Sequence, residues 1–292
     1  MILNRYLHLV VISLLFINCQ TEKPAPKTTD SIRLNQIGYY PESAKEFVLV
    51  DSEARSFQIT DELGEVVFSG ELQDRGTWET SGESVMSGNF STFKTPGTYR
   101  IEIDSVGASY TFEIKRKLYE DALNASIKSY YFQRASMPIE EAYGGIYKRA
   151  AGHPDTACVY HPSSKHKKGE LESPGGWYDA GDYGKYTVNA ALTTGQMLHL
   201  LELYPDVIPD STLNIPESGN EQRDLWYELL YDLNWINTMQ DRDGGFYHKL
   251  TAKNFSVFIM PETYDLERFV FVKGTAATLS YAAVMAHAGR MY

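Results

Sequence analysis

The chain has 292 residues, 43% of them hydrophobic, which is long enough for two domains with separate cores. Its formal net charge of −11 argues against nucleic acid as a partner. Only two cysteines occur, Cys19 and Cys158, so a fold held together by disulfides is not expected.

Residues 1–19 are predicted to be a lipoprotein signal peptide. Arg5 precedes an apolar run, Tyr6 to Ile17, which is too short for a membrane span and typical of a signal peptide. Cys19 follows almost directly, so we predict that it is lipidated; a plain secretory signal cleaved nearby is the alternative. We therefore expect an exported lipoprotein of the outer membrane, at the cell surface or in the periplasm. Residues 20–30 are expected to form a flexible linker.

Residues 31–116 are predicted to form an immunoglobulin-like β-sandwich. Short runs of alternating polarity are separated by turn signals such as Thr95-Pro96-Gly97. The predicted strands are Ile32–Ile37, Glu46–Val50, Ser56–Thr60, Val66–Ser69, Ser91–Phe93, Tyr99–Ile103 and Tyr110–Ile114. Several short strands with regular turn signals suit this fold.

From residue 117 onward the hydrophobic spacing becomes that of helices. The predicted helices are Tyr119–Tyr131, Tyr186–Tyr204, Arg223–Gln240 and Thr275–Tyr292. Two long segments, Pro138–Pro174 and Phe246–Val272, are expected to be connections without regular structure. Helices joined by alternating short turns and long loops indicate part of a ring of paired helices.

The most informative segment is Gly175–Tyr186, GGWYDAGDYGKY, which places Asp179 and Asp182 three positions apart. Its glycines disfavour a regular helix or strand at its start, and a tight turn can hold both carboxylates on one side. Aromatic faces can pack on sugar rings and carboxyl groups can transfer protons, so the pattern predicts a sugar-cleaving site. A turn that only caps the following helix is the alternative.

The stretch Gly175–Gln196 resembles the signature of glycoside hydrolase family 9, the inverting endoglucanases. Leu213–Asn220 and Lys273–Tyr292 resemble two further motifs of that family, and Arg33–Tyr39 resembles the start of the immunoglobulin-like module that precedes some of its catalytic domains. The resemblance implies a multidomain protein: an all-β sandwich followed by an all-α (α/α)6 barrel, of which residues 117–292 would be the incomplete N-terminal part.

The resemblance also implies hydrolysis of β-1,4-glucosidic bonds in cellulose or a related β-glucan. We therefore expect the chain to be the N-terminal part of a longer enzyme, truncated at its C-terminal side. A complete small domain of a different architecture is the alternative.

By resemblance, Asp182 is the general base and Asp179 helps to hold the attacking water. Inversion also needs a general acid on the opposite face of the sugar, and two carboxylates on one turn cannot supply it. The family's acid is a Glu near the end of its barrel. Glu262 and Glu267 do not match the context of that acid, so the chain alone is expected to be inactive.

The aromatic residues Trp177, Tyr178, Tyr183 and Tyr186 flank the aspartates and are predicted to bind substrate, at least one by stacking on a sugar ring. Ordinary core packing is the alternative for each of them. His248 matches a family position near the bound sugar and is predicted to contact it, with a structural role as the alternative.

No cofactor is predicted to be required. Calcium is common in the family, but its usual ligands would lie largely outside this chain. Some members bind structural zinc through a His at the position of Tyr178, and the nearby His153, Cys158, His161 and His166 fit no standard zinc spacing. Zinc is therefore not expected.

Two other functions remain open. The missing acid, the sandwich and the lipid tether would also fit a non-catalytic glycan-binding lipoprotein of the cell surface. The Gly152–Asp155 loop resembles that of exo-β-glucosaminidases in the same family. The expected partners are a polysaccharide or oligosaccharide and, through the lipid anchor, a membrane.

Overall fold

A computed structural model describes residues 26–165, 169–207 and 212–292. The chain divides into two compact units, one ending at Leu118 and one starting at Tyr119. The predicted signal peptide, Cys19 and His166 lie outside the described residues. Within the described ranges, no helix is both long and apolar enough to cross a membrane.

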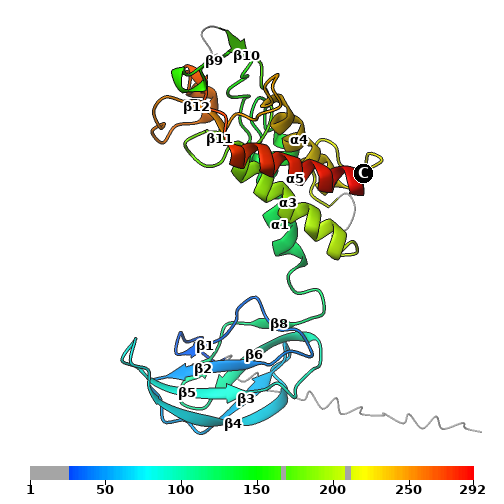
Figure 1. The fold of residues 1–292 in the computed structure, drawn as a ribbon. Helices are drawn as coiled ribbons and strands as arrows, with labels where there is room; N and C mark the ends of the chain where they lie inside the picture. The colour runs from blue at the N-terminus through cyan, green and yellow to red at the C-terminus, as the bar shows by residue number, and fades with distance from the viewer. Residues whose placement is uncertain (1–25, 166–168, 208–211) are drawn as a thin grey trace, which may run out of the picture. The chain divides into compact units, whose positions relative to one another are not determined.

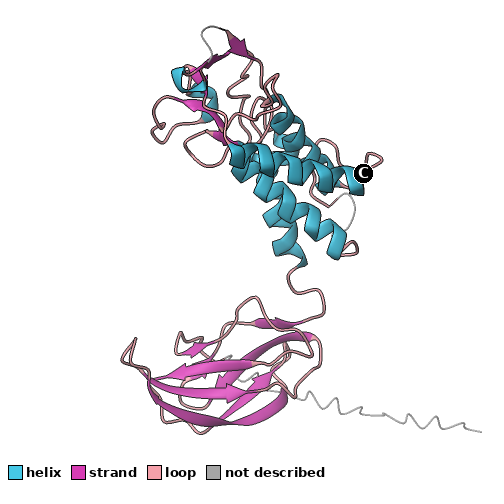
Figure 2. Cartoon of the chain, in the orientation of Figure 1, coloured by secondary structure: helices cyan, strands magenta, loops and turns pink. Residues whose placement is uncertain are grey.

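The described residues of the first unit form strands joined by loops and turns (Figures 1 and 2). They are β1 Ile32–Arg33, β2 Glu46–Val50, β3 Ser56–Thr60, β4 Val66–Thr77, β5 Ser84–Asn89, β6 Gly97–Ile103, β7 Gly107–Ala108 and β8 Phe112–Ile114. The strands pair in the order β1-β2-β5-β4-β3-β6-β7, and β8 pairs with β6. The first half of β4 pairs with β3 and its second half with β5. This one long strand therefore belongs to both layers of the sandwich, the layer that contains β3 and the layer that contains β5.

A cluster of aromatic residues fills the space between the layers. Phe47, Phe57 and Phe90 are almost fully buried, and Phe47 meets Phe57 edge to face with ring centroids 4.9 Å apart. Burial of such large apolar side chains is the main stabilising contribution in a sandwich of this size.

The predicted strands at β2 and β3 are confirmed in full, and those at β6 and β8 within two residues. The strand predicted at Ser91–Phe93 was wrong, because the chain pairs earlier, at β5. Gly88 weakens the strand pattern of β5 in the sequence. A Cβ at this position would stand 2.1 Å from the ring of Phe47 on β2, so that ring occupies the space of a side chain.

The second unit packs its helices around a separate core. The helices are α1 Glu120–Gln133, α2 Glu141–Gly144, α3 Thr187–Leu203, α4 Asp224–Thr238 and α5 Thr275–Met291, with 3-10 turns at Gly145–Tyr147, Pro162–Ser164 and Pro261–Thr263. Helix α3 packs against both α4 and α5, as Figure 1 shows. The four long helices confirm the predicted ones, with ends that differ by at most two residues.

A small sheet also belongs to this unit. Its strands are β9 Cys158–Tyr160, β10 Glu170–Leu171, β11 Lys185–Tyr186, β12 Lys249–Ala252 and β13 Arg268–Val270, in the order β10-β9-β13-β12-β11. The prediction that Pro138–Pro174 and Phe246–Val272 lack regular structure was therefore wrong. Strands of two to four residues show no periodicity, and their partners lie far away in the sequence.

Candidate active site

Asp179 and Asp182 lie on a tight turn that leads into β11. The Asp179 amide donates to the Gly184 carbonyl at 2.8 Å, and the Tyr183 amide donates to the Ala180 carbonyl at 3.1 Å. Tyr183 has a φ of +53°, in the left-handed region. The turn therefore places both carboxyl groups on one closed loop, as expected from the sequence.

Both oxygens of Asp182 accept a hydrogen bond. The Gly184 amide donates to Oδ1 at 3.1 Å, and the Tyr186 hydroxyl donates to Oδ2 at 2.6 Å. Burial, and then the bond to this carboxylate, raises the pKa of Tyr186 well above its usual value, so the phenol remains a donor. Each carboxylate oxygen keeps a further lone pair for another donor such as water.

Asp179 is exposed, and its Oδ1 accepts from the Asn189 side chain of α3 at 2.8 Å. Among the described residues, neither Asp179 nor Asp182 forms a salt bridge. Two carboxylates that are oriented by neutral donors and left without a counter-ion are suited to accept protons.

Gly176 lets the chain approach the core just before the turn. Its φ is +75°, and a Cβ at this position would stand 2.5 Å from the ring of Trp235. Any other residue would meet both backbone strain and a clash. The Gly-rich spacing is therefore required by the packing of this segment onto α4.

The sheet brings His248 to the turn. Strands β11 and β12 are antiparallel, with Tyr186 opposite Lys249, and the Thr187 amide donates to the His248 carbonyl at 3.0 Å. The rings of Tyr186 and His248 lie edge to face at 6.3 Å. Burial, with a smaller effect of Lys249, lowers the pKa of His248. The structure thus places His248 beside the tyrosine that holds Asp182.

A buried ionic cluster supports the turn from below. The fully buried Lys185 ammonium lies 2.8 Å from Asp155 and donates to the carbonyls of Ser173 and Gly175, each at 2.8 Å. Arg268 donates to Asp155 at 3.0 Å and, through Nη1, to the Tyr183 carbonyl at 2.6 Å. The cluster therefore fixes the backbone on both sides of the two aspartates.

Trp177 and Tyr178 lie in the interior, 5% and 3% exposed. The Trp177 indole donates to Glu228 at 2.7 Å, and the Tyr178 hydroxyl bonds His153 Nδ1 at 2.8 Å. Neither ring has a free face in this structure, which supports core packing, the alternative stated above, over sugar stacking. Tyr183 and Tyr186 are half-buried at the turn, so the structure brings these two together with the aspartates.

The segment 253–260 also reaches the turn, which the sequence pattern did not indicate. The Ser256 hydroxyl donates to the Gly181 carbonyl at 2.7 Å, and the Tyr183 hydroxyl donates to the Ile259 carbonyl. The segment carries exposed Phe255 and Phe258. Two phenylalanines in a long connection give no periodic signal, so only the contact reveals them.

Three of the zinc candidates, His153, Cys158 and His161, lie within the described residues. His153 bonds Tyr178, and His161 stacks on Phe271 with centroids 4.4 Å apart. Burial, followed by the charge of Asp155, raises the pKa of the Cys158 thiol to about 12. Among the described residues these side chains do not converge within metal-binding distance.

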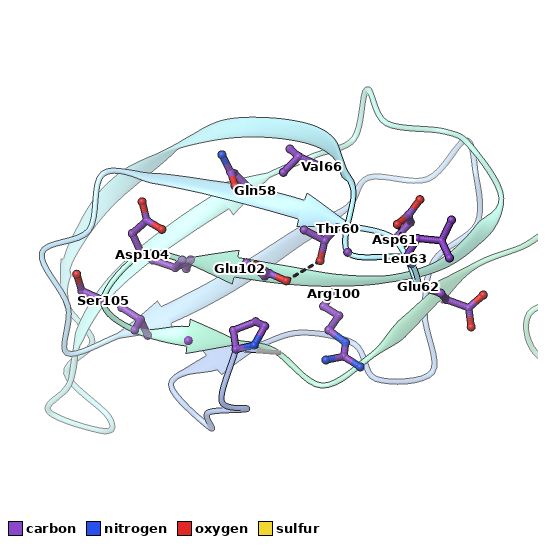
Figure 3. Close-up of a pocket in the computed structure, with 15 residues that line it drawn as sticks. Gln58, Thr60, Asp61, Glu62, Leu63, Val66, Arg100, Glu102, Asp104 and Ser105 are labelled. Atoms are coloured by element: carbon purple, nitrogen blue, oxygen red, sulfur yellow. Dashed lines mark hydrogen bonds between the residues drawn. The ribbon is translucent and has the colours of Figure 1, made fainter. Parts of the chain in front are cut away.

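A separate hollow lies on the first unit (Figure 3). It is lined by Gln58, Thr60, Arg100, Glu102 and Asp104, among others, and the Thr60 hydroxyl donates to Glu102 at 2.8 Å. It contains none of the residues predicted to act on the sugar.

Comparison with protein families gives two matches. Residues 119–292 match "Glycosyl hydrolase family 9", and residues 27–108 match "Cellulase N-terminal ig-like domain". The two matches cover the two compact units in turn.

Curated relatives agree with these matches. The chain is 41% identical over 271 residues to a xyloglucan-specific endo-β-1,4-glucanase of Bacteroides ovatus, covering 90% of this chain and 46% of the relative. It is 34% identical over 282 residues to endoglucanase D of Acetivibrio thermocellus, covering 94% of this chain and 44% of the relative. The chain thus spans about half the length of the curated relatives it matches.

Solved structures show the same relationship. A Bacteroides ovatus GH9 structure superimposes with a TM-score of 0.83 at 40% identity, over 90% of this chain and 49% of that one. A complex of AaCel9A with a cellobiose-like isofagomine gives a TM-score of 0.77 at 28% identity, over 90% of this chain and 48% of that one.

Proposed function

Because the chain belongs to glycosyl hydrolase family 9, whose catalytic domain is an (α/α)6 barrel, we propose that it acts in the inverting hydrolysis of β-1,4-glucosidic bonds in a β-glucan. The observation that carries the proposal is the turn 179–184. It holds two carboxylates by neutral hydrogen bonds, free of salt bridges among the described residues, next to exposed aromatic side chains.

The two aspartates take different roles in this proposal. Asp182, with both oxygens oriented by Gly184 and Tyr186, removes a proton from the attacking water. Asp179, steered by Asn189, accepts the second hydrogen bond of that water. The water then attacks the anomeric carbon from the side opposite to the leaving oxygen, which inverts the configuration.

The leaving oxygen needs a proton from the other face of the sugar. The acid and base of an inverting enzyme stand about 6.5–9.5 Å apart to leave room for water. Asp179 and Asp182 share one turn, so neither can reach that face. A third carboxyl group, supplied by the full-length protein, completes the reaction in this proposal.

The substrate side is formed by half-buried Tyr183, Tyr186 and His248 and by the exposed Phe255 and Phe258 of the neighbouring segment. Flat aromatic faces suit the apolar faces of glucose units. Xyloglucan is the first substrate to test, because the relative named as xyloglucan-specific shares 41% identity with this chain. We also propose that the protein is exported and held at a membrane through a lipid on Cys19.

The test compares the protein expressed from its complete gene with the Asp182→Asn and Asp179→Asn variants. Reducing-sugar release is measured on xyloglucan, carboxymethylcellulose and cello-oligosaccharides. Loss of the base is expected to lower kcat by about 10²–10⁴-fold. Asp61→Asn, which changes another turn aspartate in the first unit, serves as the matched control and should leave kcat unchanged.

Two further measurements distinguish the proposed hydrolysis from the alternative functions. Proton NMR of the first product should show the α-anomer, as inversion at a β-linkage requires. Wild-type rates in Asp182→Asn would contradict the proposal. Binding of cello-oligosaccharides by calorimetry, without any sugar release by the complete protein, would instead identify a glycan-binding lipoprotein, and release of single terminal glucosamine units would identify an exo-β-glucosaminidase.

A further inference from the structure

We propose that α3 and α5 together form a binding site for a divalent transition metal of the Zn²⁺ type, made by His199, Glu202 and His287. His199 and Glu202 are three residues apart on α3, so they share one helix face. His287 reaches them from α5, which packs along α3. The three side chains each offer one ligand atom, and these atoms lie within 4.8 Å of one another.

The distances are close to those that a metal would need. Glu202 Oε2 is 2.8 Å from His287 Nε2 and 3.9 Å from His199 Nδ1, and the two imidazole centroids are 4.5 Å apart. Ligands at about 2.0–2.1 Å around a tetrahedral ion are separated by roughly 3.3 Å. The two carboxylate–imidazole distances fall on either side of this value by about 0.5 Å, so metal binding requires rotamer adjustments of the three side chains.

The chemistry of the three ligands selects the kind of ion. Two imidazole nitrogens and one carboxylate oxygen suit Zn²⁺ and neighbouring transition metals, whereas Ca²⁺ and Mg²⁺ prefer oxygen ligands. Three protein ligands leave the fourth tetrahedral position to water. His287 Nε2 hydrogen-bonds Glu202 Oε2 at 2.8 Å, and a metal ion between these two atoms would replace that bond.

Arg290 orients the carboxylate for this role. Its Nη1 donates to Glu202 Oε1 at 2.6 Å, so the other oxygen, Oε2, faces both histidines. Carboxylates that bind a metal ion usually accept a hydrogen bond from a neighbouring group, which fixes their orientation.

The site is distinct from the candidate active site. Glu202 lies thirteen residues after Asn189 on α3, which corresponds to about 20 Å along a helix axis. A metal here would therefore not touch the sugar. It would link α3, which carries Asn189, to α5 and so stabilise the packing of the two helices.

The experiment uses the full chain after dialysis against a chelator. Co²⁺ is added at pH 7.5 as the spectroscopic probe, and Zn²⁺ is then used to displace it. We expect one equivalent of tetrahedral Co²⁺, seen as intense visible absorption, and a rise of the melting temperature with Zn²⁺. The variants His199→Gln, Glu202→Gln and His287→Gln should each weaken Zn²⁺ binding by at least about tenfold.

His199→Gln is the decisive variant because the His199 side chain is 63% exposed, so its replacement should disturb the fold little. His161→Gln and Glu141→Gln change a half-buried histidine and an exposed carboxylate elsewhere and serve as matched controls that should bind as the wild type does. Absence of stoichiometric binding, or unchanged binding in both His199→Gln and Glu202→Gln, would overturn the proposal. Activity on β-glucan is not part of this readout, so its outcome does not depend on the proposed function.

Discussion

Among the described residues, the hydroxyl of Tyr186 is the side-chain donor that bonds Asp182. Tyr186→Phe removes that hydroxyl and keeps the ring beside His248. A lost hydrogen bond to a reacting carboxylate is worth about 1–1.5 kcal/mol, so we expect kcat on β-glucan to fall roughly five- to tenfold while KM changes little. Tyr281→Phe, which removes a hydroxyl bonded to Asn237, is the control and should leave both constants unchanged. Equal losses in the two variants would contradict the assigned role.

Asp232 of α4 is a buried carboxyl group whose Oδ1 accepts from the Trp177 amide at 3.1 Å. Burial raises its pKa to about 7, only partly offset by that amide and by Lys185. In the unfolded chain the Asp232 carboxyl group has an ordinary pKa of about 4. Between pH 4 and 7 the folded state thus binds more protons, so the free energy of unfolding falls as pH rises, by up to roughly 4 kcal/mol.

Asp232→Asn removes this titration. Urea denaturation should show the variant close to the wild type at pH 5 and more stable than the wild type at pH 8, because the amide carries no charge to desolvate. Asp121→Asn, an exposed change on α1, should leave the pH dependence as it is in the wild type. A wild-type-like slope in Asp232→Asn would show that this carboxyl group does not control it.

At the scale of elements, the turn rests on a buried ionic cluster. Although burial alone would raise the pKa of Asp155, Lys185 and Arg268 together lower it. Asp155→Asn removes the carboxylate that pairs with the buried cations Lys185 and Arg268. We therefore expect the free energy of unfolding to fall by about 3–5 kcal/mol. The measurement is equilibrium denaturation at pH 7. The exposed pair of Glu42 and Lys94 gives the control, since Glu42→Gln should have no measurable effect.

The sequence predicts the elements whose hydrophobic period extends over several turns or alternations. Helix α4 is an example, because Leu225, Leu229 and Ile236 mark one buried face. It does not predict the five-stranded sheet, since β11 has two residues and gains its structure from β12, more than sixty positions later. Long-range pairing of this kind has no local signature.

The same contrast holds for the site. The spacing of Asp179 and Asp182 among glycines and aromatic residues is a local pattern, so it identifies the turn by itself. The sequence does not reveal that Tyr186 is half-buried while Trp177 is buried, because burial depends on how α4 packs beneath the turn. Asp155 and Arg268 also stay hidden, since they meet 113 positions apart.

At the scale of the whole molecule, the proposed lipid anchor on Cys19 can be tested directly. We expect metabolic labelling with palmitate to mark the wild type, and Cys19→Ala to abolish the label and release the protein from the membrane fraction. Cys158→Ala is the control, because this second thiol is buried in the folded unit. Label retained in Cys19→Ala would favour a plain secretory signal.

Strand β11 has one residue for each face of the sheet. Lys185 turns inward to Asp155, and Tyr186 turns toward Asp182. Sliding this segment by one position would exchange the two side chains, placing an ammonium where the phenol belongs and a phenol among the buried ions. Asp182→Asn or Tyr186→Phe each alters one group of the site, whereas insertion or deletion of one residue between 182 and 187 would disable the base and the scaffold at once.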